Sequence, residues 1–277
     1  MTKATPAAAR IIVVGAGKSG TSALYYSLKS AAERHYGKSL RGLFEPKTPE
    51  QIADFSQASG VTKVLLERLV KMPDWHALVR GFSARVAIVR DPRDSIISRL
   101  MWIAATRLNR VGSDHQRKVR NALLRKENTP SSLSVMELCK VVGTLHEYPD
   151  RFLSLTRELA YLPAVLVKDD SPLFNIHYED FIAHNVAALE QYLGFPLPER
   201  FELPVNAQLI RRTASSGNWK NWFLPEDFRY FVDPMISELS ALGYTDERSS
   251  IGRQIISPDE ISAYLERADE KFGPATA

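Results

Sequence analysis

The sequence has only one cysteine, Cys139, among its 277 residues, and it has no long hydrophobic run. A single cysteine cannot form an intramolecular disulfide bond, and it cannot supply a cysteine-based zinc cluster. The longest apolar stretch near the start, Ile11 to Val14, falls short of the ~7–15 residues of a signal-peptide core and of the ~20 residues of a membrane span. These absences favour a cytoplasmic protein without a transmembrane segment.

An excess of one charge sign is also lacking, because 36 Lys and Arg residues stand against 32 Asp and Glu residues, for a formal net charge of +4. Hydrophobic residues make up 44% and charged residues 25% of the chain, which is ordinary for a globular domain. A balance this even argues against a nucleic-acid polymer as partner, while the small excess of cations suits a protein that handles anions. The placement of the basic residues therefore matters more than their sum.

Short apolar runs alternate with segments of helical periodicity, and no internal repeat, low-complexity tract or linker interrupts them. The runs predicted as strands are Arg10–Gly15, Arg41–Pro46 (a loop or short strand), Val61–Leu66, Arg85–Arg90 and Phe174–Tyr178. The segments predicted as helices are Thr21–Arg34, Asp94–Arg107, Ser132–Leu162 with an interruption at Pro149, and Glu179–Leu193. A last predicted helix opens with a capping box from Ser257 to Glu260 and ends near Phe272. This alternation predicts an α/β fold with a central, mainly parallel sheet flanked by helices, in a single domain over residues 1–277 with a flexible start at residues 1–9.

A glycine-rich turn, Gly15–Ser22 (GAGKSGTS), joins the first predicted strand to the first helix. Free backbone N–H groups and the positive end of the helix converge in such a turn, and its glycines let an anion come close. Lys18 adds a point charge, while the hydroxyl groups of Thr21 and Ser22 add hydrogen-bond donors. We therefore interpret the turn as a phosphate-binding loop.

Two familiar patterns fit this loop incompletely. Gly15, Gly17 and Gly20 satisfy the dinucleotide fingerprint G-x-G-x-x-G, but the acidic partner of that fingerprint would be Glu45, which comes late in the chain. A Walker A loop, G-x-x-x-x-G-K-[ST], would need its first glycine at Ile12, inside the strand. Both patterns therefore leave a required residue unmatched.

A third pattern fits position by position. The segment Lys18–Ser22 (KSGTS) resembles the loop Lys-Ser-Gly-Thr-Thr/Ser of the sulfotransferases that use 3′-phosphoadenosine 5′-phosphosulfate (PAPS). The segment Arg90–Asp94 (RDPRD), followed by Ser98, resembles the 3′-phosphate motif of the same family, Arg-Asn/Asp-Pro-Lys/Arg-Asp. The resemblance implies that Arg90 and Ser98 bind the 3′-phosphate, and we expect Asp94 to cap the helix that follows.

Two further segments are similar to the same family. Residues 211–223 (RRTASSGNWKNWF) resemble its late loop Arg-Lys-Gly-x-x-Gly-Asp-Trp-Lys-Asn, with departures at positions 213, 214 and 218. Residues 178–180 (YED) resemble a Tyr-Glu-Asp segment whose tyrosine lies near the adenine. Trp219 or Phe223 is expected to stack on the purine. The cofactor contacts that these segments imply come from Tyr178, Arg212, Gly217, Asn218 and Trp219.

The resemblance spans residues 11–223 and implies a P-loop-like fold, with helical insertions at 107–135 and 140–173 over the acceptor side. It implies in-line transfer of a sulfuryl group from PAPS to the hydroxyl of an acceptor. Phe44–Pro46 (FEP) resembles a segment of the carbohydrate-type members, and carbohydrate, glycolipid and small-metabolite acceptors all stay open. Two other functions are weighed beside it: a P-loop kinase that uses ATP and Mg²⁺, and a non-catalytic nucleotide-binding protein of the PAPS fold.

The resemblance also implies roles for single residues. Lys18 would meet the negative charge that develops on the leaving oxygen, so that fixed cations replace a metal ion. Glu45 is our first choice for the general base, Glu67 and His76 are the runners-up, and Lys63 is a further candidate to assist at the sulfuryl oxygens. The residues expected to hold the 5′-phosphate are Lys18, Ser19, Gly20, Thr21 and Ser22, and Gly17 is expected to bind the cofactor beside them.

Overall fold

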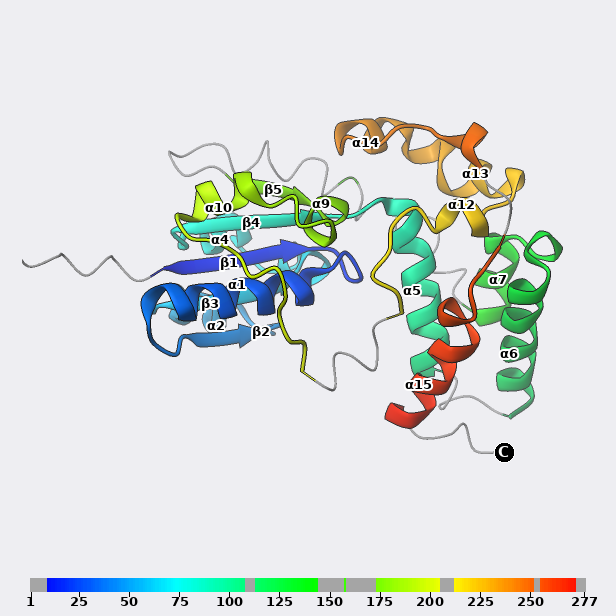
Figure 1. Cartoon of the computed structure of the whole chain (residues 1–277), viewed down its shortest axis with the longest axis horizontal. Helices are drawn as coiled ribbons and strands as arrows, with labels where there is room; N and C mark the ends of the chain where they lie inside the picture. Colours follow the sequence, from blue (N-terminus) through cyan, green and yellow to red (C-terminus); the bar gives the residue numbers. More distant parts are fainter. Residues whose placement is uncertain are drawn as a thin grey trace, which may run out of the picture. The chain divides into compact units, whose positions relative to one another are not determined.

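The computed structural model of the chain describes residues 9–107, 113–143, 157, 173–204, 212–251 and 255–272 (Figure 1). The chain divides into two compact units, and we describe each by itself. The sheet unit comprises Met1–Arg90 and Tyr161–Glu202, and the helical unit comprises Asp91–Ala160 and Leu203–Ala277. Each unit buries a hydrophobic core of its own. The organisation as a single domain stays a prediction.

The sheet unit is built on five strands that all run parallel, in the order β2-β3-β1-β4-β5. The strands are β1 (Arg10–Gly15), β2 (Arg41–Phe44), β3 (Gly60–Leu65), β4 (Ala84–Val89) and β5 (Phe174–His177). The central strand β1 is apolar on both faces, and Ile11–Val14 is fully buried, as a strand covered on both sides requires. The prediction of an α/β fold with a central parallel sheet flanked by helices is therefore confirmed.

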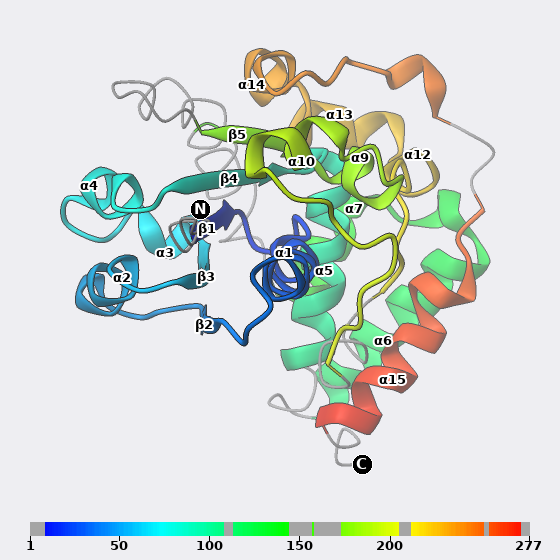
Figure 2. The ribbon, with the colours of Figure 1, turned by 60° about the vertical axis from the view of Figure 1, so that its left-hand side comes forward.

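Helices cover both faces of this sheet. They are α1 (Thr21–Tyr36), α2 (Pro49–Ser56), α3 (Leu66–Leu69), α4 (Trp75–Arg80), α9 (Tyr178–Ile182) and α10 (Ala187–Leu193). Figure 2 shows α1 and α10 on one side of the strands and α2 and α4 on the other. Leu28 of α1 and Leu189 of α10 share one buried cluster with Val86 of β4. The sheet is thus shielded from water by two helical layers.

One predicted helix of this unit is wrong. The segment Glu179–Leu193 forms two short helices, because His184 adopts a left-handed conformation with φ 59°. The N–H group of Asn185 turns back to the carbonyl of Asp180 at 2.8 Å, which ends α9. The apolar periodicity continues through this break, so the sequence pattern does not reveal it.

The connections between strands define a switch point at the carboxyl end of the sheet. From β1 the chain passes through α1 to β2 on one side, and from β4 it proceeds to β5 on the other side. Ligands of open parallel sheets bind outside the carboxyl ends of strands at such a point. The segments that leave β1 and β4 here are Ala16–Gly20 and Arg90.

The helical unit holds no strand within its described residues. Its helices are α5 (Pro92–Arg107), α6 (Ser113–Asn128), α7 (Val135–Val142), α12 (Trp219–Trp222), α13 (Pro225–Phe231), α14 (Ile236–Ala241) and α15 (Ser262–Phe272). Buried Asp227 accepts the N–H groups of Val135 and Met136, each at 3.0 Å, and so satisfies two free donors at the start of α7. This carboxylate ties α13 to α7 within one core.

The long helix predicted over Ser132–Leu162 is not continuous. Its described part is α7, which begins at Val135 and ends at Val142, where Gly143 follows with φ 75°. Residues 144–156 and 158–172 lie outside the described residues, as does most of the predicted insertion at 140–173. The insertion at 107–135 supplies α6, and its position over an acceptor stays a prediction.

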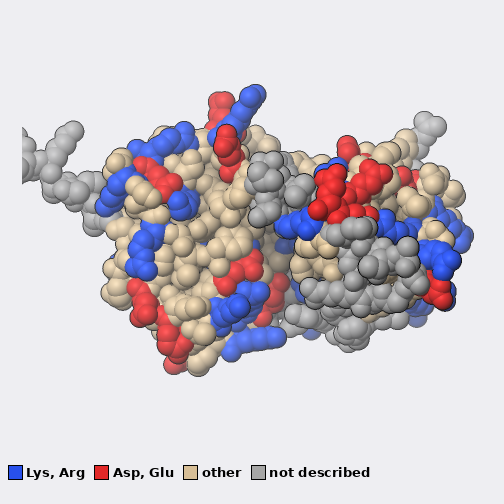
Figure 3. Space-filling view, turned by 90° about the horizontal axis from the view of Figure 1, so that it is seen from below, with Lys and Arg blue, Asp and Glu red and all other residues tan. Residues whose placement is uncertain are grey.

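The described surface mixes the two charge signs. Figure 3 shows basic and acidic side chains in small neighbouring groups on the face that it draws. None of the helices in the described ranges is long and apolar enough to cross a membrane.

Candidate functional site

The predicted phosphate loop follows β1 as a tight turn. Ser19 donates its N–H and its hydroxyl to the carbonyl of Ala16, at 3.2 and 2.7 Å, which fixes the turn. Lys18 and Gly20 adopt left-handed conformations, with φ 73° and 92°. Gly20 is the N-cap of α1 and supplies no side-chain cap to the first N–H groups of that helix. The turn thus presents backbone donors at the positive end of a 16-residue helix, and its role in binding an anion stays a prediction.

Gly20 is also required by close packing. A Cβ atom at this position would lie 2.5 Å from Cδ2 of Tyr178, which is far inside the van der Waals contact distance. Tyr178 begins α9 directly after β5 and is buried. The loop after β1 and the residue after β5 therefore meet because the residue between them has no side chain.

Arg90 joins the same group from the end of β4. Its guanidinium lies 4.4 Å from the centre of the Tyr178 ring, and Nη1 donates to the carbonyl of Lys18 at 3.2 Å. The side chain is 6% exposed, so its charge is held in a largely desolvated place. Three residues predicted to bind the cofactor, Lys18, Arg90 and Tyr178, are thus brought together within the sheet unit.

A second group of polar residues gathers around Lys63 of β3. The Lys63 ammonium donates to the hydroxyl of Ser22 at 2.9 Å and to Oε1 of Glu45 at 2.5 Å, and it lies 4.2 Å from the ring centre of Phe44. Burial lowers the pKa of Lys63, while the hydrogen bond and the negative charge of Glu45 oppose that shift. Lys63 thereby connects the predicted base to the end of the phosphate loop.

Glu45 is placed by the way the chain leaves β2. Its N–H donates to the carbonyl of Lys63 at 2.9 Å, and its φ of 53° turns the chain at the end of the strand. Arg68 makes a second ion pair with the carboxylate at 3.4 Å. The side chain is 25% exposed, so the carboxylate is paired with cations and still reaches the surface.

The two runners-up for the base lie on different helices. Glu67 is on α3, and both of its carboxylate oxygens accept the N–H group of Gly17, at 3.2 and 3.1 Å. His76 is on α4 with its ring stacked on that of Trp75, at 3.6 Å between ring centres. Of these two residues, Glu67 directly contacts the phosphate loop.

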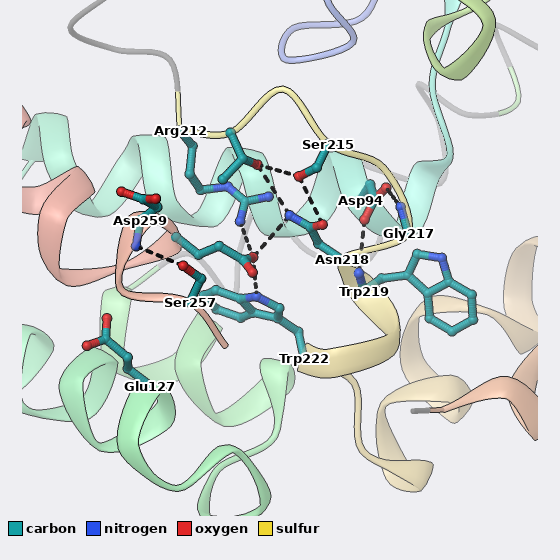
Figure 4. A network of polar contacts seen from close by, with 12 residues as sticks. Asp94, Glu127, Arg212, Ser215, Gly217, Asn218, Trp219, Trp222, Ser257 and Asp259 are labelled. Carbon is teal, nitrogen blue, oxygen red and sulfur yellow. Dashed lines mark hydrogen bonds and ion pairs between the residues drawn. The ribbon is translucent and has the colours of Figure 1, made fainter. Parts of the chain in front are cut away.

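In the helical unit the expected role of Asp94 is wrong. The helix α5 begins at Pro92, so the N-cap is Asp91, whose Oδ1 accepts the N–H group of Arg93 at 2.9 Å. Asp94 lies within the first turn of α5 and accepts the N–H groups of Gly217 and Trp219, at 2.6 and 2.9 Å (Figure 4). This carboxylate therefore fixes the late loop at the start of α12.

Arg212 of that loop is ion-paired inside the helical unit. Its Nη1 lies 2.5 Å from Oε2 of Glu260, and the same oxygen accepts from Nδ2 of Asn218 at 3.1 Å and from Nε1 of Trp222 at 2.9 Å (Figure 4). Glu260 is therefore not part of the predicted capping box. Ser257 instead accepts from the N–H group of Asp259 at 3.3 Å, Pro258–Glu260 forms a 3₁₀ turn, and α15 starts at Ser262.

Three other residues predicted from the helical unit, Ser98, Trp219 and Phe223, are buried. Ser98 lies on α5. The Trp219 ring is 1% exposed, with the guanidinium of Arg93 at 3.9 Å from its centre, and Phe223 is fully buried beside it. Either ring would have to leave the core in order to stack on a purine. The cofactor contacts of Ser98, Arg212, Gly217, Asn218 and Trp219 stay predictions.

The sequence contains one signal for the polar group around Lys63. Lys63 stands in the middle of an apolar run, GVTKVL, where a lysine is rarely buried without a partner. That position alone indicates a buried ion pair, although its partners Glu45 and Ser22 lie 18 and 41 positions away along the chain.

Comparison with protein-family models, with curated proteins and with solved structures finds no match. Within the described part of the chain, no group of three or more His, Cys, Asp or Glu side chains is arranged to hold a metal ion.

Proposed function

We propose that the protein is a sulfotransferase that uses PAPS and transfers its sulfuryl group to an acceptor hydroxyl. The proposal is based on the contacts among Lys18, Arg90 and Tyr178. These residues follow three different strands, and they come together at the carboxyl end of one parallel sheet. The strand order, with the glycine-rich loop at its switch point, supports a P-loop-like fold.

The residues of the sheet unit fit the anionic part of this cofactor. The backbone of the loop from Lys18 to Ser22, with the hydroxyl groups of Thr21 and Ser22, would hold the 5′-phosphate. Buried Arg90 would bind the 3′-phosphate, because a guanidinium matches the geometry of phosphate oxygens. When bound, PAPS supplies a sulfuryl group that is activated by its phosphate leaving group.

The chemistry asked of the chain is to stabilise charge and to move one proton. Lys18 stabilises negative charge on the leaving oxygen, and Glu45 takes the proton of the acceptor hydroxyl. Lys63 holds the Glu45 carboxylate in place through the 2.5 Å ion pair. Both Lys18 and Glu45 have left-handed backbones, and conformations of this kind in residues other than glycine cluster at functional sites.

Isothermal titration calorimetry with adenosine 3′,5′-bisphosphate tests the binding half of the proposal, with ATP–Mg²⁺ as the competing ligand. We expect the bisphosphate to bind more tightly than ATP–Mg²⁺, and Arg90→Ala to weaken its binding by at least about tenfold, because a phosphate loses a charge-assisted partner. Tighter binding of ATP–Mg²⁺ would support a kinase instead.

Labelled PAPS with a panel of hydroxyl acceptors tests the transfer half. We expect Glu45→Gln to lower kcat far more than it lowers affinity for the bisphosphate, because a general base acts only in the reacting complex. If only affinity changed, the base would lie elsewhere. Bisphosphate binding without transfer to any acceptor would identify a non-catalytic binding protein.

A further inference from the structure

One backbone donor of the phosphate loop is already taken by the protein itself. The N–H group of Gly17 points to both carboxylate oxygens of Glu67, at 3.1 and 3.2 Å, across 50 positions of sequence. In anion-binding loops these N–H groups are the donors that a phosphate or sulfuryl oxygen would use. Glu67 therefore places a negative charge next to the part of the loop where the negative charge of a ligand would bind.

The charge of Glu67 reaches the rest of the site. Burial lowers the pKa of Lys63, and the negative charges of Glu45 and Glu67 both act against that shift. The carboxylate of Glu67 is half-buried, so water screens its charge only in part. A ligand in the loop therefore meets both the cations Lys18 and Arg90 and the carboxylate of Glu67.

We propose that Glu67 is a specificity-determining residue that makes the phosphate loop select anions of low charge. The inference rests on the proposed function in so far as the loop binds the anionic part of a ligand. Repulsion between a fixed carboxylate and a ligand grows with the ligand's charge. The loop consequently disfavours the triphosphate tail of a nucleotide and favours a phosphate monoester or a sulfuryl group.

The variant Glu67→Gln isolates the charge. The amide oxygen of glutamine still accepts the N–H group of Gly17, so the loop keeps one of its two contacts with this side chain while the negative charge is removed. The matched control is Asp54→Asn, which removes an exposed carboxylate from α2 of the same unit. Circular dichroism and thermal unfolding verify that both variants fold.

The probes are inorganic phosphate, pyrophosphate and tripolyphosphate, measured by calorimetry at one pH and one salt concentration. We expect Glu67→Gln to tighten the binding of all three, by about twofold for phosphate and by at least about tenfold for tripolyphosphate, because each further ligand charge adds to the relief of repulsion. Asp54→Asn should leave all three affinities within about twofold of the parent chain.

Three outcomes would overturn the inference: an equal gain for all three anions, weaker binding by the variant, or no binding of any anion to either chain. Weaker binding would mean that Glu67 serves to preform the loop. A parallel titration with adenosine 3′,5′-bisphosphate separates this test from the proposed function. If the graded gain is seen but the bisphosphate does not bind better than phosphate, the role of Glu67 stands and the proposed function fails.

Discussion

Each unit of the molecule holds a buried cation paired with a glutamate at 2.5 Å, and the two pairs differ in how exposed the glutamate side chain is. In the sheet unit Lys63 is 3% exposed and its partner Glu45 is 25% exposed. In the helical unit Arg212 is 4% exposed, and its partner Glu260 is 8% exposed and also accepts from Asn218 and Trp222. The first pair reaches the surface beside the phosphate loop, whereas the second is enclosed. The comparison indicates that the Glu45 carboxylate is accessible to solvent, while Glu260 holds the late loop together.

The largest expected effect comes from removing the carboxylate of the enclosed pair, Arg212 and Glu260. Glu260→Ala leaves the Arg212 guanidinium buried without its carboxylate, and we expect the free energy of unfolding to fall by about 3–5 kcal/mol. Urea unfolding followed by tryptophan fluorescence measures the loss. The control is Asp114→Ala, which removes the exposed partner of Arg117 and should cost less than about 1 kcal/mol. A loss for Glu260→Ala as small as the control's would remove the distinction between the pairs.

The second prediction concerns Lys18 in the sheet unit, whose replacement should lower activity rather than stability. We expect Lys18→Ala to lower the rate of sulfuryl transfer by about 10²–10³-fold, because the developing charge on the leaving oxygen loses its cation. Its unfolding free energy should stay within about 1 kcal/mol of the parent chain. Turnover assays with labelled PAPS and urea unfolding measure the two quantities. Near-normal turnover would contradict the assignment of Lys18.

A third prediction sharpens the comparison with a buried lysine that has no carboxylate hydrogen-bonded to it among the described contacts. Lys126 of the helical unit donates to the carbonyls of Pro130 and Leu133, each at 2.6 Å, and burial lowers its pKa to about 8. Between about pH 8 and pH 10.5 the unfolded chain therefore binds more protons at this residue than the folded chain.

Stability should consequently rise with pH through this window, by up to about 3 kcal/mol. The measurement is urea unfolding at pH 7.5 and 9.5, compared with Lys126→Met, which lacks the titrating group and should show a smaller rise. Parallel pH dependence in the two proteins would mean that Lys126 is not the origin of the effect.

The smallest expected effect concerns the carboxylate that fixes the late loop. Asp94→Ala leaves the N–H groups of Gly217 and Trp219 without their acceptor, and we expect a loss of about 1–3 kcal/mol in unfolding free energy. Hydrogen exchange of these two amides should accelerate more than that of amides in the middle of α6. Equal protection in both places would show that other contacts hold the loop.

The central strands and the turn between β1 and α1 could be predicted because their signals are local. β1 and β4 are short apolar runs with β-branched residues, and the loop between β1 and α1 is a contiguous motif. Local signals fail where a polar side chain has two possible partners. Asp94 fits the pattern of a helix N-cap, but Pro92 starts the helix and Asp91 takes that role.

The two remaining errors arise from a long-range partner and from a local backbone conformation. Glu260 stands where a capping box expects it, yet a buried arginine 48 positions earlier in the chain offers a stronger partner than a backbone N–H group. His184 breaks a helix through its backbone conformation alone, and its neighbours keep the helical spacing of apolar residues. Partner choices across long sequence separations depend on the fold, so they become visible only with the structure.

The contact between Gly20 and Tyr178 also bears on the order in which the protein assembles. The strand β5, which carries Tyr178 next to its end, pairs with β4 only after the chain has passed through residues 90–173. During synthesis the strands β1 to β4 are therefore complete before Tyr178, which packs against Gly20 of the loop, has been added to the chain. Pairings between segments this distant in the sequence form slowly. A nascent chain consequently carries its phosphate loop for some time before that loop is closed by Tyr178.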